Sequence, residues 1–192
     1  MRIYVTRHGE TEYSRDGIVC GTTDCPLTDF GREQAISLAR EIERQHLKFG
    51  IVYTSPLLRA KETAEIVAKA FDTALIVDPR LREQDCGAYE GRVPRNDRRF
   101  SAARMHFANR LDGGESSLQL AQRIYGFLDD LIKDGKETAP LIVGHACVCK
   151  MIHTYFHELT NEEYFEFKLG NCELLSYEFQ RRMTEKECAR NG

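Results

Sequence analysis

Short apolar runs alternate with amphipathic segments along most of this chain, and that alternation constrains the fold more than any other feature. The runs that predict buried strands are residues 2–6, 50–54, 74–77 and 140–144, with a last strand expected within residues 171–179. Apolar residues at helical spacing predict helices over residues 30–47, 116–132 and about 147–157. This order predicts an α/β fold: a three-layer sandwich whose mostly parallel central sheet is flanked by helices.

One more helix is expected directly after the second strand. Ser55 suits the N-cap position and Pro56 suits the first helical position, so the helix is predicted to begin there. Only residues 84–113, rich in glycine and arginine, break the alternation. We expect a single domain over residues 1–192, with 84–113 forming loop and a small helical cap above the site.

Composition narrows the classes of protein that this chain can represent. A net charge of −3 argues against a nucleic-acid-binding surface, and no apolar run is long enough to span a membrane. Arg7 interrupts the first apolar run, so no signal peptide is expected and a cytoplasmic location is predicted. Seven scattered cysteines without a CxxC pair indicate free thiols rather than a metal site, and we expect neither metal nor cofactor.

Basic side chains follow three of the predicted parallel strands at the points where those strands end. Arg7 and His8 follow the first strand, Arg59 lies one turn beyond Ser55 after the second, and His145 follows the fourth. Ligands of open parallel sheets bind beyond the carboxyl ends of the strands. Guanidinium groups match phosphate oxygens two at a time, and a helix N-terminus adds donors. The sequence therefore predicts a phosphate-binding site at this edge.

Each of these residues has an ordinary structural explanation when it is taken alone. Arg7 and Arg59 could be surface arginines, and His8 and His145 could simply hydrogen-bond neighbouring backbone. All of these explanations would have to hold together at three strand ends, which favours the functional interpretation.

Six segments in this order give the chain a resemblance to a known family. They are RHGET, LTDFGREQA, SPLLRAKETAEI, LREQDCGAYEG, GGESS and LIVGHACV. The chain resembles the histidine phosphatase superfamily, also called phosphoglycerate-mutase-like, over about residues 1 to 178. The resemblance implies metal-independent hydrolysis of small phosphomonoesters from phosphorylated metabolites, through a phosphohistidine intermediate.

The resemblance also assigns roles to the residues at the strand ends. His8 resembles the nucleophile, and Arg7 and Arg59 resemble the arginines that hold the phosphoryl oxygens. His145 resembles the second histidine of the pocket, with the N–H group of Ala146 beside it. Neutral imidazole is a good nucleophile near neutral pH, and the neighbouring cations should keep His8 neutral. These cations can stabilise the transition state without a metal ion.

Further positions follow from the same resemblance. Glu83 resembles the acid that protonates the leaving group, although a surface ion pair with Arg80 or Arg82 is the alternative. Gly9 resembles the glycine that lets the loop approach the ligand. Ser14 stands where many members have asparagine and could still donate to phosphate. Residues expected near the substrate are Gly21, Thr22 and Thr23.

Two details favour a phosphatase over a phosphoglycerate mutase. Mutases of this family continue from the glutamate with a longer, lysine-bearing signature and carry a larger insertion before the GGES segment. This chain has REQDCGAYEGRVP and only 22 residues between Gly91 and Gly114. A short cap leaves the phosphohistidine open to water. The alternatives are a cofactor-dependent mutase and a non-catalytic protein that binds phosphorylated ligands.

The cap segment is strongly basic. Between Arg92 and Arg110 one acid, Asp97, stands against six arginines: Arg92, Arg95, Arg98, Arg99, Arg104 and Arg110. One hypothesis is that some of them face the non-phosphate end of an anionic substrate; the alternative is a solvated helix face. The segment over residues 164–179 could serve as a sheet edge or as the interface of a homodimer, and the sequence leaves both open.

Overall fold

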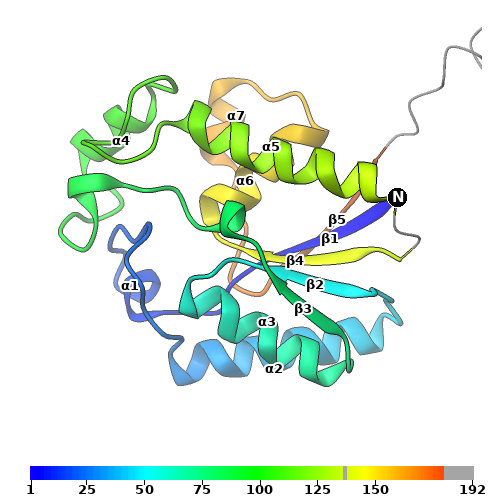
Figure 1. Ribbon diagram of the computed structural model, residues 1–192. Coiled ribbons are helices and arrows are strands. Elements are labelled where there is room, and N and C mark those ends of the chain that lie inside the picture. Colours follow the sequence, from blue (N-terminus) through cyan, green and yellow to red (C-terminus); the bar gives the residue numbers. More distant parts are fainter. Residues whose placement is uncertain (136–137, 180–192) are drawn as a thin grey trace, which may run out of the picture.

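A five-stranded sheet forms the centre of the molecule, which we describe from a computed structural model over residues 1–135 and 138–179. The strands are β1 (Arg2–Arg7), β2 (Ile51–Thr54), β3 (Ala74–Val77), β4 (Pro140–Gly144) and β5 (Leu174–Glu178). Their order in the sheet is β3-β2-β4-β1-β5 (Figure 1). The first four are parallel, and β5 pairs with β1 in the antiparallel direction. The predicted fold class is confirmed.

Helices cover both faces of the sheet (Figure 1). On one face, α2 (Asp29–Arg44) and α3 (Leu58–Ala70) pack against Tyr4, Val52 and Leu141. On the other, α5 (Ser117–Asp134) and α6 (Ala146–Phe156) pack against a core that includes Ile3, Val5 and Ile142. Successive strand residues point to opposite faces, so a strand buried on both sides is apolar throughout.

Local signals explain where the long helices begin and end. α2 begins after Thr28, whose side chain accepts the Gly31 N–H. α5 begins with a capping box formed by Ser116 and Gln119 and ends at Gly135, whose left-handed backbone (φ 58°) favours glycine. Each lies within three residues of its predicted bounds.

The predicted start of α3 is wrong. The helix begins at Leu58, with Leu57 in the N-cap position, rather than at Pro56. The Ser55 hydroxyl accepts the Leu57 N–H at 3.2 Å, while the Leu58 N–H donates to Asp24 Oδ1 at 2.7 Å. A carboxylate distant in sequence therefore caps this helix, which no local pattern could reveal.

Residues 84–113 contain loop and short helices, as expected. The helices are the 3-10 turn η2 (Gly87–Tyr89) and α4 (Arg98–Arg104), and a second 3-10 turn, η1 (Pro79–Leu81), precedes the segment. Val19, Cys86, Phe100 and Leu111 form a small separate core beneath α4. The segment thereby packs on the loop after α1 (Glu12–Arg15), beyond the carboxyl ends of the parallel strands (Figure 1).

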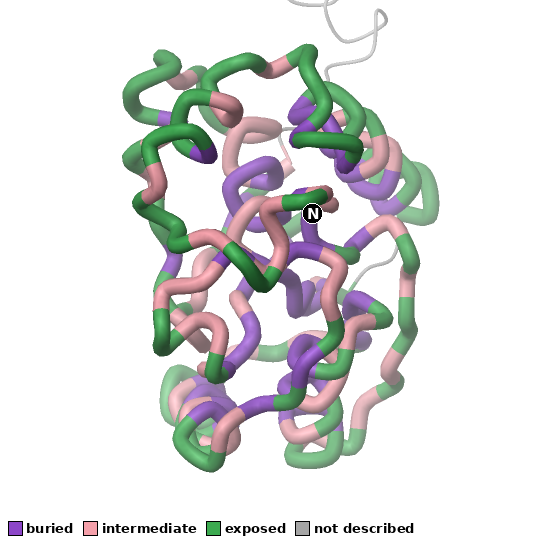
Figure 2. The backbone as a smooth tube through the Cα atoms, turned by 90° about the vertical axis from the view of Figure 1, so that its left-hand side faces the viewer, coloured by how far each residue is buried: buried purple, intermediate pink, exposed green. Residues whose placement is uncertain are grey.

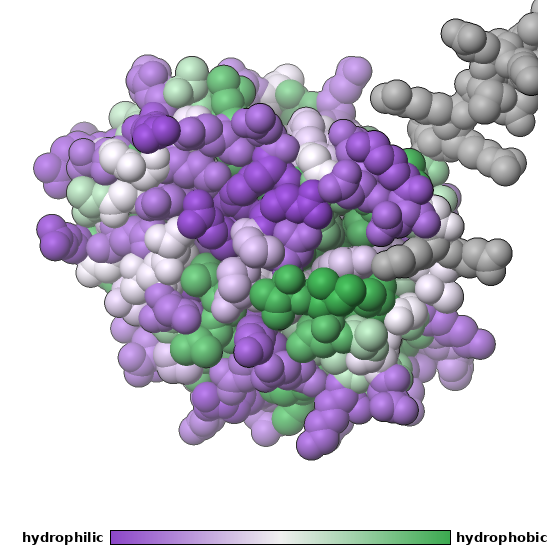
Figure 3. All heavy atoms as spheres, in the orientation of Figure 1, coloured by the Kyte–Doolittle hydropathy of each residue, from purple (hydrophilic) through white to green (hydrophobic). Residues whose placement is uncertain are grey.

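Burial is uneven around the molecule. Figure 2 views the side on which the parallel strands end, and its centre is mostly buried and half-buried backbone framed by exposed segments. The edge strand β3 exposes Ile76 and Val77, and Figure 3 shows an apolar patch in that region. In the described part of the chain, no helix has the length and apolar character needed to cross a bilayer. Six cysteines are free thiols, and Cys188 lies outside the described residues.

Candidate active site

The structure brings the two predicted histidines together at the carboxyl edge of the sheet. The His8 N–H donates to the Gly144 carbonyl at 3.0 Å, so the end of β1 is fixed beside the end of β4. The rings of His8 and His145 meet edge to face, with their centres 5.2 Å apart. Their residues are 5% and 0% exposed respectively. With Arg7 and Arg59 they form what we call the phosphate rim.

Hydrogen bonding sets the tautomer of His8. Its Nδ1 lies 2.7 Å from the Gly9 carbonyl oxygen, which can only accept, so Nδ1 carries the proton. Nε2 is left with the lone pair. Burial, and then the cations of Arg59 and Arg7, hold the pKa of His8 well below its usual range. His8 is therefore a neutral imidazole with a lone pair on Nε2.

The backbone around His8 is held from three directions. Asn171 Nδ2 donates to the His8 carbonyl at 2.7 Å, and the Gly9 N–H donates to Thr63 Oγ1 at 3.1 Å. A Cβ on Gly9 would lie 2.3 Å from the Gly31 carbonyl oxygen. Gly9 thus lets the start of α2 pack closely on this loop. Its closeness to ligand stays a prediction.

Arg59 is buried and cradled by the loop over residues 21–25. Its guanidinium donates to the Gly21 carbonyl at 2.8 Å and to the Thr23 carbonyl at 3.0 Å, and it contacts Cys25 Sγ at 3.8 Å. The residue is only 1% exposed. These carbonyls fix the fork of the guanidinium, which suits bidentate binding of a phosphate.

Three nitrogens of the phosphate rim are buried without a hydrogen-bond partner among the described residues: Arg7 Nε, His145 Nδ1 and His145 Nε2. Arg7 is otherwise held by its Nη1, which donates to the Leu169 carbonyl at 3.2 Å. Burial, Arg59 and His8 hold the pKa of His145 well below its usual range. Buried polar groups are nearly always paired, so unpaired ones in a cluster indicate a binding site.

Glu83 lies between the cap segment and the N-terminus of α6. One of its oxygens accepts the Gln84 N–H at 2.9 Å, and the other accepts the Cys147 N–H at 3.1 Å. Glu83 is 5% exposed. The alternative of a surface ion pair is wrong: among the described residues Glu83 forms no ion pair with Arg80 or Arg82, and Arg80 pairs with Asp78 and Asp130.

Arg123 of α5 positions the segment that carries Glu83. Its guanidinium binds both oxygens of Glu115 at 2.7 Å and donates to the carbonyls of Arg82 and Glu83 at 2.7 and 3.2 Å. Sequence reasoning missed this residue, although Glu115 belongs to the GGESS segment that carried the resemblance. Nothing local links residues 123 and 83; only the packing of α5 does.

Thr22 and Thr23 are hydrogen-bonded to Glu90, a residue that the sequence analysis did not single out. Glu90 accepts the N–H groups of both at 2.9 and 2.7 Å, and it also accepts the Cys86 N–H at 3.0 Å. Glu90 lies in the LREQDCGAYEG segment, which was the available signal. Gly21 contributes its carbonyl to Arg59. Direct contact of these residues with substrate stays a prediction.

Ser14 and Ala146 take different local roles. The Ser14 hydroxyl donates to the Thr11 carbonyl at 2.9 Å and accepts the Thr11 N–H, which closes the capping box of α1. Its contact with phosphate stays a prediction. Ala146 is the first residue of α6, beyond His145 in the N-cap position, so its N–H lies at the positive end of the helix.

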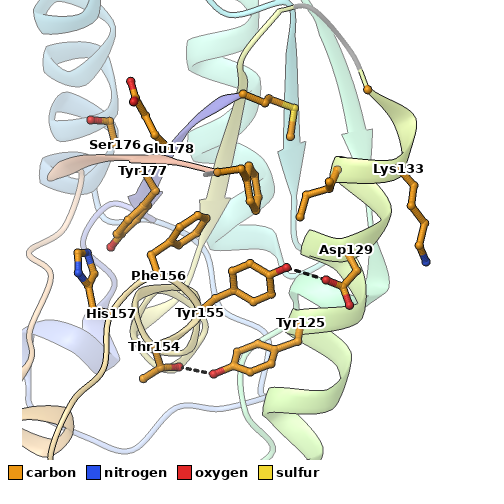
Figure 4. A pocket seen from close by; sticks show the side chains of 14 residues that line it. Tyr125, Asp129, Lys133, Thr154, Tyr155, Phe156, His157, Ser176, Tyr177 and Glu178 are labelled. Atoms are coloured by element: carbon orange, nitrogen blue, oxygen red, sulfur yellow. Dashed lines mark hydrogen bonds between the residues drawn. The ribbon is translucent and has the colours of Figure 1, made fainter. Parts of the chain in front are cut away.

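A separate groove lies between α5, α6 and β5 (Figure 4). In it, the Tyr155 hydroxyl donates to Asp129 at 2.6 Å and Tyr125 hydrogen-bonds Thr154 at 2.9 Å. No predicted site residue lines this groove. Over residues 1–135 and 138–179, no group of three or more His, Cys, Asp or Glu is placed to hold a metal ion.

Comparison with known proteins agrees with this geometry. The histidine phosphatase superfamily (branch 1) matches residues 3–191, and the chain belongs to this family. A probable phosphoglycerate mutase, GpmB, of Cronobacter sakazakii is 29% identical over 187 residues, which cover 94% of this chain and 86% of that protein.

Two solved structures are similar throughout. The α-ribazole phosphatase of Shigella flexneri superposes with a TM-score of 0.81 at 26% identity, covering 94% of this chain and 92% of the other. A histidine-to-alanine variant of Entamoeba histolytica phosphoserine phosphatase, solved with phosphoserine, gives 0.80 at 27% identity over 94% and 91%. The predicted family is confirmed. The predicted function as a phosphatase of small phosphomonoesters is also confirmed, and a phosphoglycerate mutase is the weaker alternative.

Proposed function

We propose that His8 attacks the phosphorus of small phosphomonoesters and that water hydrolyses the resulting phosphohistidine, with Glu83 as proton donor and no metal ion. The observation that carries this proposal is the neutral His8, with its lone pair on Nε2, beside three unpaired nitrogens of Arg7 and His145. A nucleophile and oxyanion donors in one buried place are what phosphoryl transfer needs.

The proposed first step moves one phosphoryl group. Arg7, Arg59 and His145 bind its oxygens while the His8 Nε2 lone pair forms the N–P bond. The bond between phosphorus and the ester oxygen breaks, and Glu83 gives its proton to the leaving alkoxide. An arriving phosphate dianion favours protonation of His145, which adds a charged donor.

In the second step water attacks the phosphohistidine. Glu83, now a carboxylate, takes the proton from that water, and the N–P bond breaks with its electron pair returning to His8. The Gln84 and Cys147 N–H groups orient both oxygens of Glu83, so the same carboxyl serves both steps. Because Glu83 is fixed in this way, proton transfer to or from it is effectively intramolecular, which lowers the entropic part of the barrier.

The cap and the surroundings of the enzyme complete the proposal. Residues 84–113 act as the cap of one catalytic domain over residues 1–192, and relatives that act on α-ribazole phosphate or phosphoserine support a phosphorylated metabolite as substrate. A cytoplasmic location, a homodimer and the absence of a nucleic-acid partner stay predictions. Light scattering of the purified chain measures the homodimer directly.

A panel of metabolite phosphates, assayed for released phosphate in EDTA, tests the proposed function. We expect turnover in EDTA and a loss of about 10³-fold or more in His8→Asn. His46→Asn, at an exposed histidine, should retain the activity of the unaltered chain. Turnover only with a bisphosphoglycerate would support the mutase, and binding without turnover would support a non-catalytic protein.

A further inference from the structure

Two cysteine side chains meet at the ends of the loop that cradles Arg59. The sulfur atoms of Cys20 and Cys25 lie 3.8 Å apart, close to van der Waals contact, and both thiols are free. A disulfide places its sulfurs about 2.0 Å apart, so an approach of about 1.8 Å would join this pair. Neither residue belongs to a helix or a strand, so this movement breaks no regular element.

Cys25 has the surroundings of a reactive thiol. Its Sγ lies 3.8 Å from Nη1 of the Arg59 guanidinium, and a neighbouring cation favours the thiolate. The hydrogen bond from Cys20, and then the Arg59 cation, outweigh burial and lower the pKa of Cys25. Cys25 is 6% exposed, and it lines a surface pocket of about 750 Å³ together with Glu10 and Asp24. A pocket of this size admits hydrogen peroxide, which is hardly larger than water.

The remaining described cysteines have different surroundings. Burial raises the pKa of Cys147 to about 11 and that of Cys172 to about 12. It raises the pKa of Cys86 and of Cys149 as well. In the part of the chain that the structure describes, no other two sulfur atoms lie within hydrogen-bond distance of each other. Oxidation follows thiolate character, so Cys25 should react before these four thiols.

The residues between the two cysteines hold Arg59 in two ways. The carbonyls of Gly21 and Thr23 accept hydrogen bonds from its guanidinium at 2.8 and 3.0 Å. The Asp24 carboxylate accepts the Leu58 N–H at 2.7 Å and so caps α3, the helix that carries Arg59. A bond between the cysteines would draw the ends of this loop together and displace these acceptors. The guanidinium would then lose the orientation that suits a phosphate.

Close packing makes the loop sensitive to a small displacement. A Cβ on Gly21 would lie 2.3 Å from the Gln84 carbonyl oxygen, so the loop lies directly against the segment that follows Glu83. The same loop is tied to the cap by Glu90, which accepts the N–H of Thr22 at 2.9 Å. The loop therefore has little room to adapt to a shorter distance between its ends while its carbonyls stay in place.

We propose that Cys25 is an oxidation site with Cys20 as its resolving partner, and that their disulfide reversibly lowers phosphatase activity by displacing the carbonyls that hold Arg59. The effect on activity rests on the proposed phosphatase function, whereas formation of the disulfide does not. A low-pKa thiol beside a second thiol is the arrangement that peroxide-sensing cysteines share.

The oxidant is a peroxide, and the reaction balances in two steps. The Cys25 thiolate attacks one oxygen of hydrogen peroxide, the O–O bond breaks, and the released hydroxide takes up a proton to become water. Cys25 is now a sulfenic acid. The Cys20 sulfur then bonds to the Cys25 sulfur, and the hydroxyl group leaves as a second water with the Cys20 proton. Two thiols are oxidised and one peroxide is reduced, and a dithiol reductant reverses the bond by exchange.

Peptide mapping of the peroxide-treated full chain measures the disulfide. Trypsin cleaves after Arg15 and Arg32, which places both cysteines in one peptide, residues 16–32. We expect this peptide to become lighter by two hydrogen atoms before the other cysteines react. At the same time kcat/KM for p-nitrophenyl phosphate should fall about tenfold or more, because a positioned phosphate donor is displaced. Dithiothreitol should restore both the mass and the activity.

Three serine variants, each compared with its own reduced activity, separate the roles of the thiols. Cys20→Ser should form no disulfide in the peptide, and dimedone should trap a sulfenic acid on Cys25. Cys25→Ser should keep its activity in the same peroxide. Cys172→Ser is the matched control, because Cys172 is half-buried like Cys20, and it should lose and regain activity as the unaltered chain does.

Three results would contradict the proposal. If both thiols of residues 16–32 persist while activity falls or while other cysteines are oxidised, the oxidation site is wrong. If the disulfide forms and kcat/KM stays within twofold, its effect on Arg59 is wrong. If the reduced protein hydrolyses no phosphomonoester, the phosphatase and its regulation both fail, and the peptide mass still supports or overturns the disulfide.

Discussion

The phosphate rim and the cap segment are held in place in very different ways. Rim residues follow the ends of parallel strands, where sheet pairing and buried hydrogen bonds determine their positions, and His145 is fully buried. The cap rests on a small core around Phe100 and on the hydrogen bonds of Glu90, and most of its arginines are exposed. From this comparison we expect the reaction to depend on residues that the sheet holds in place, and substrate choice to depend on the cap segment, which has fewer buried contacts.

Removal of a rim cation should have the largest effect. In Arg59→Met we expect kcat/KM for any accepted phosphomonoester to fall about 10²–10³-fold, because a preorganised donor to the transferring oxygens is lost. Arg40→Met, at an exposed position on α2, is the control. A folded Arg59→Met protein within tenfold of the original activity would show that the rim does not hold the phosphoryl group.

The two rim histidines should also behave differently from free imidazole. The pKa of His8 and that of His145 are both held well below the usual range by burial and then by Arg59. Nitrogen-15 NMR should therefore find both rings neutral at pH 6, where a free imidazole is mostly protonated. Because the unfolded chain binds those protons first, each histidine should reduce stability as the pH falls below about 6.5. Charged rings at pH 6 would contradict the proposed nucleophile.

The link between rim and cap can be tested at Glu90. Burial alone would raise the pKa of Glu90, but hydrogen bonds from Thr23, Thr22 and Cys86 outweigh it and lower the pKa. The stabilisation is therefore present above the unfolded pKa of about 4.3 and is lost as the pH falls through the lower folded value. Glu90→Gln should lower the urea midpoint more at pH 7 than at pH 3.

Activity should respond to the same substitution. Because Glu90 holds the loop that cradles Arg59, we expect kcat in Glu90→Gln to fall about tenfold. Glu43→Gln, at an exposed position on α2, is the matched control. An unchanged kcat would show that Glu90 does not help to position Arg59. An equal loss of stability at pH 7 and at pH 3 would show that the charge of Glu90 does not stabilise the fold.

The smallest effect is expected on the exposed face of the cap. Arg98→Ala and Arg99→Ala should change the KM of any accepted phosphomonoester less than twofold, because the Arg99 side chain is 84% exposed and its pair with Asp97 lies on the surface. A KM increase of tenfold or more would mean that the exposed face of α4 contacts the substrate, which would contradict the expectation that this face is only solvated.

The same contrast explains what the sequence could predict. His8, Arg59 and His145 follow apolar strands whose parallel pairing brings their ends to one edge, so local patterns were enough to place them. Glu90 and Arg123 act across irregular segments of the chain. Ser14 was expected to face phosphate, yet its hydroxyl closes a capping box with Thr11. Tertiary contacts decide the positions of Glu90 and Arg123, and no short-range spacing encodes them. The Ser14 capping box is a local contact, and the contact of Ser14 with phosphate stays a prediction.

The central claim is that the phosphoryl group passes through His8. Rapid acid-free quenching with ³²P-labelled substrate, followed by peptide mapping in alkali, where phosphohistidine survives, measures this directly. The account predicts a labelled intermediate that forms and decays at rates consistent with turnover, with the label on His8 alone. Turnover without any labelled protein, or a label on another residue, would contradict it.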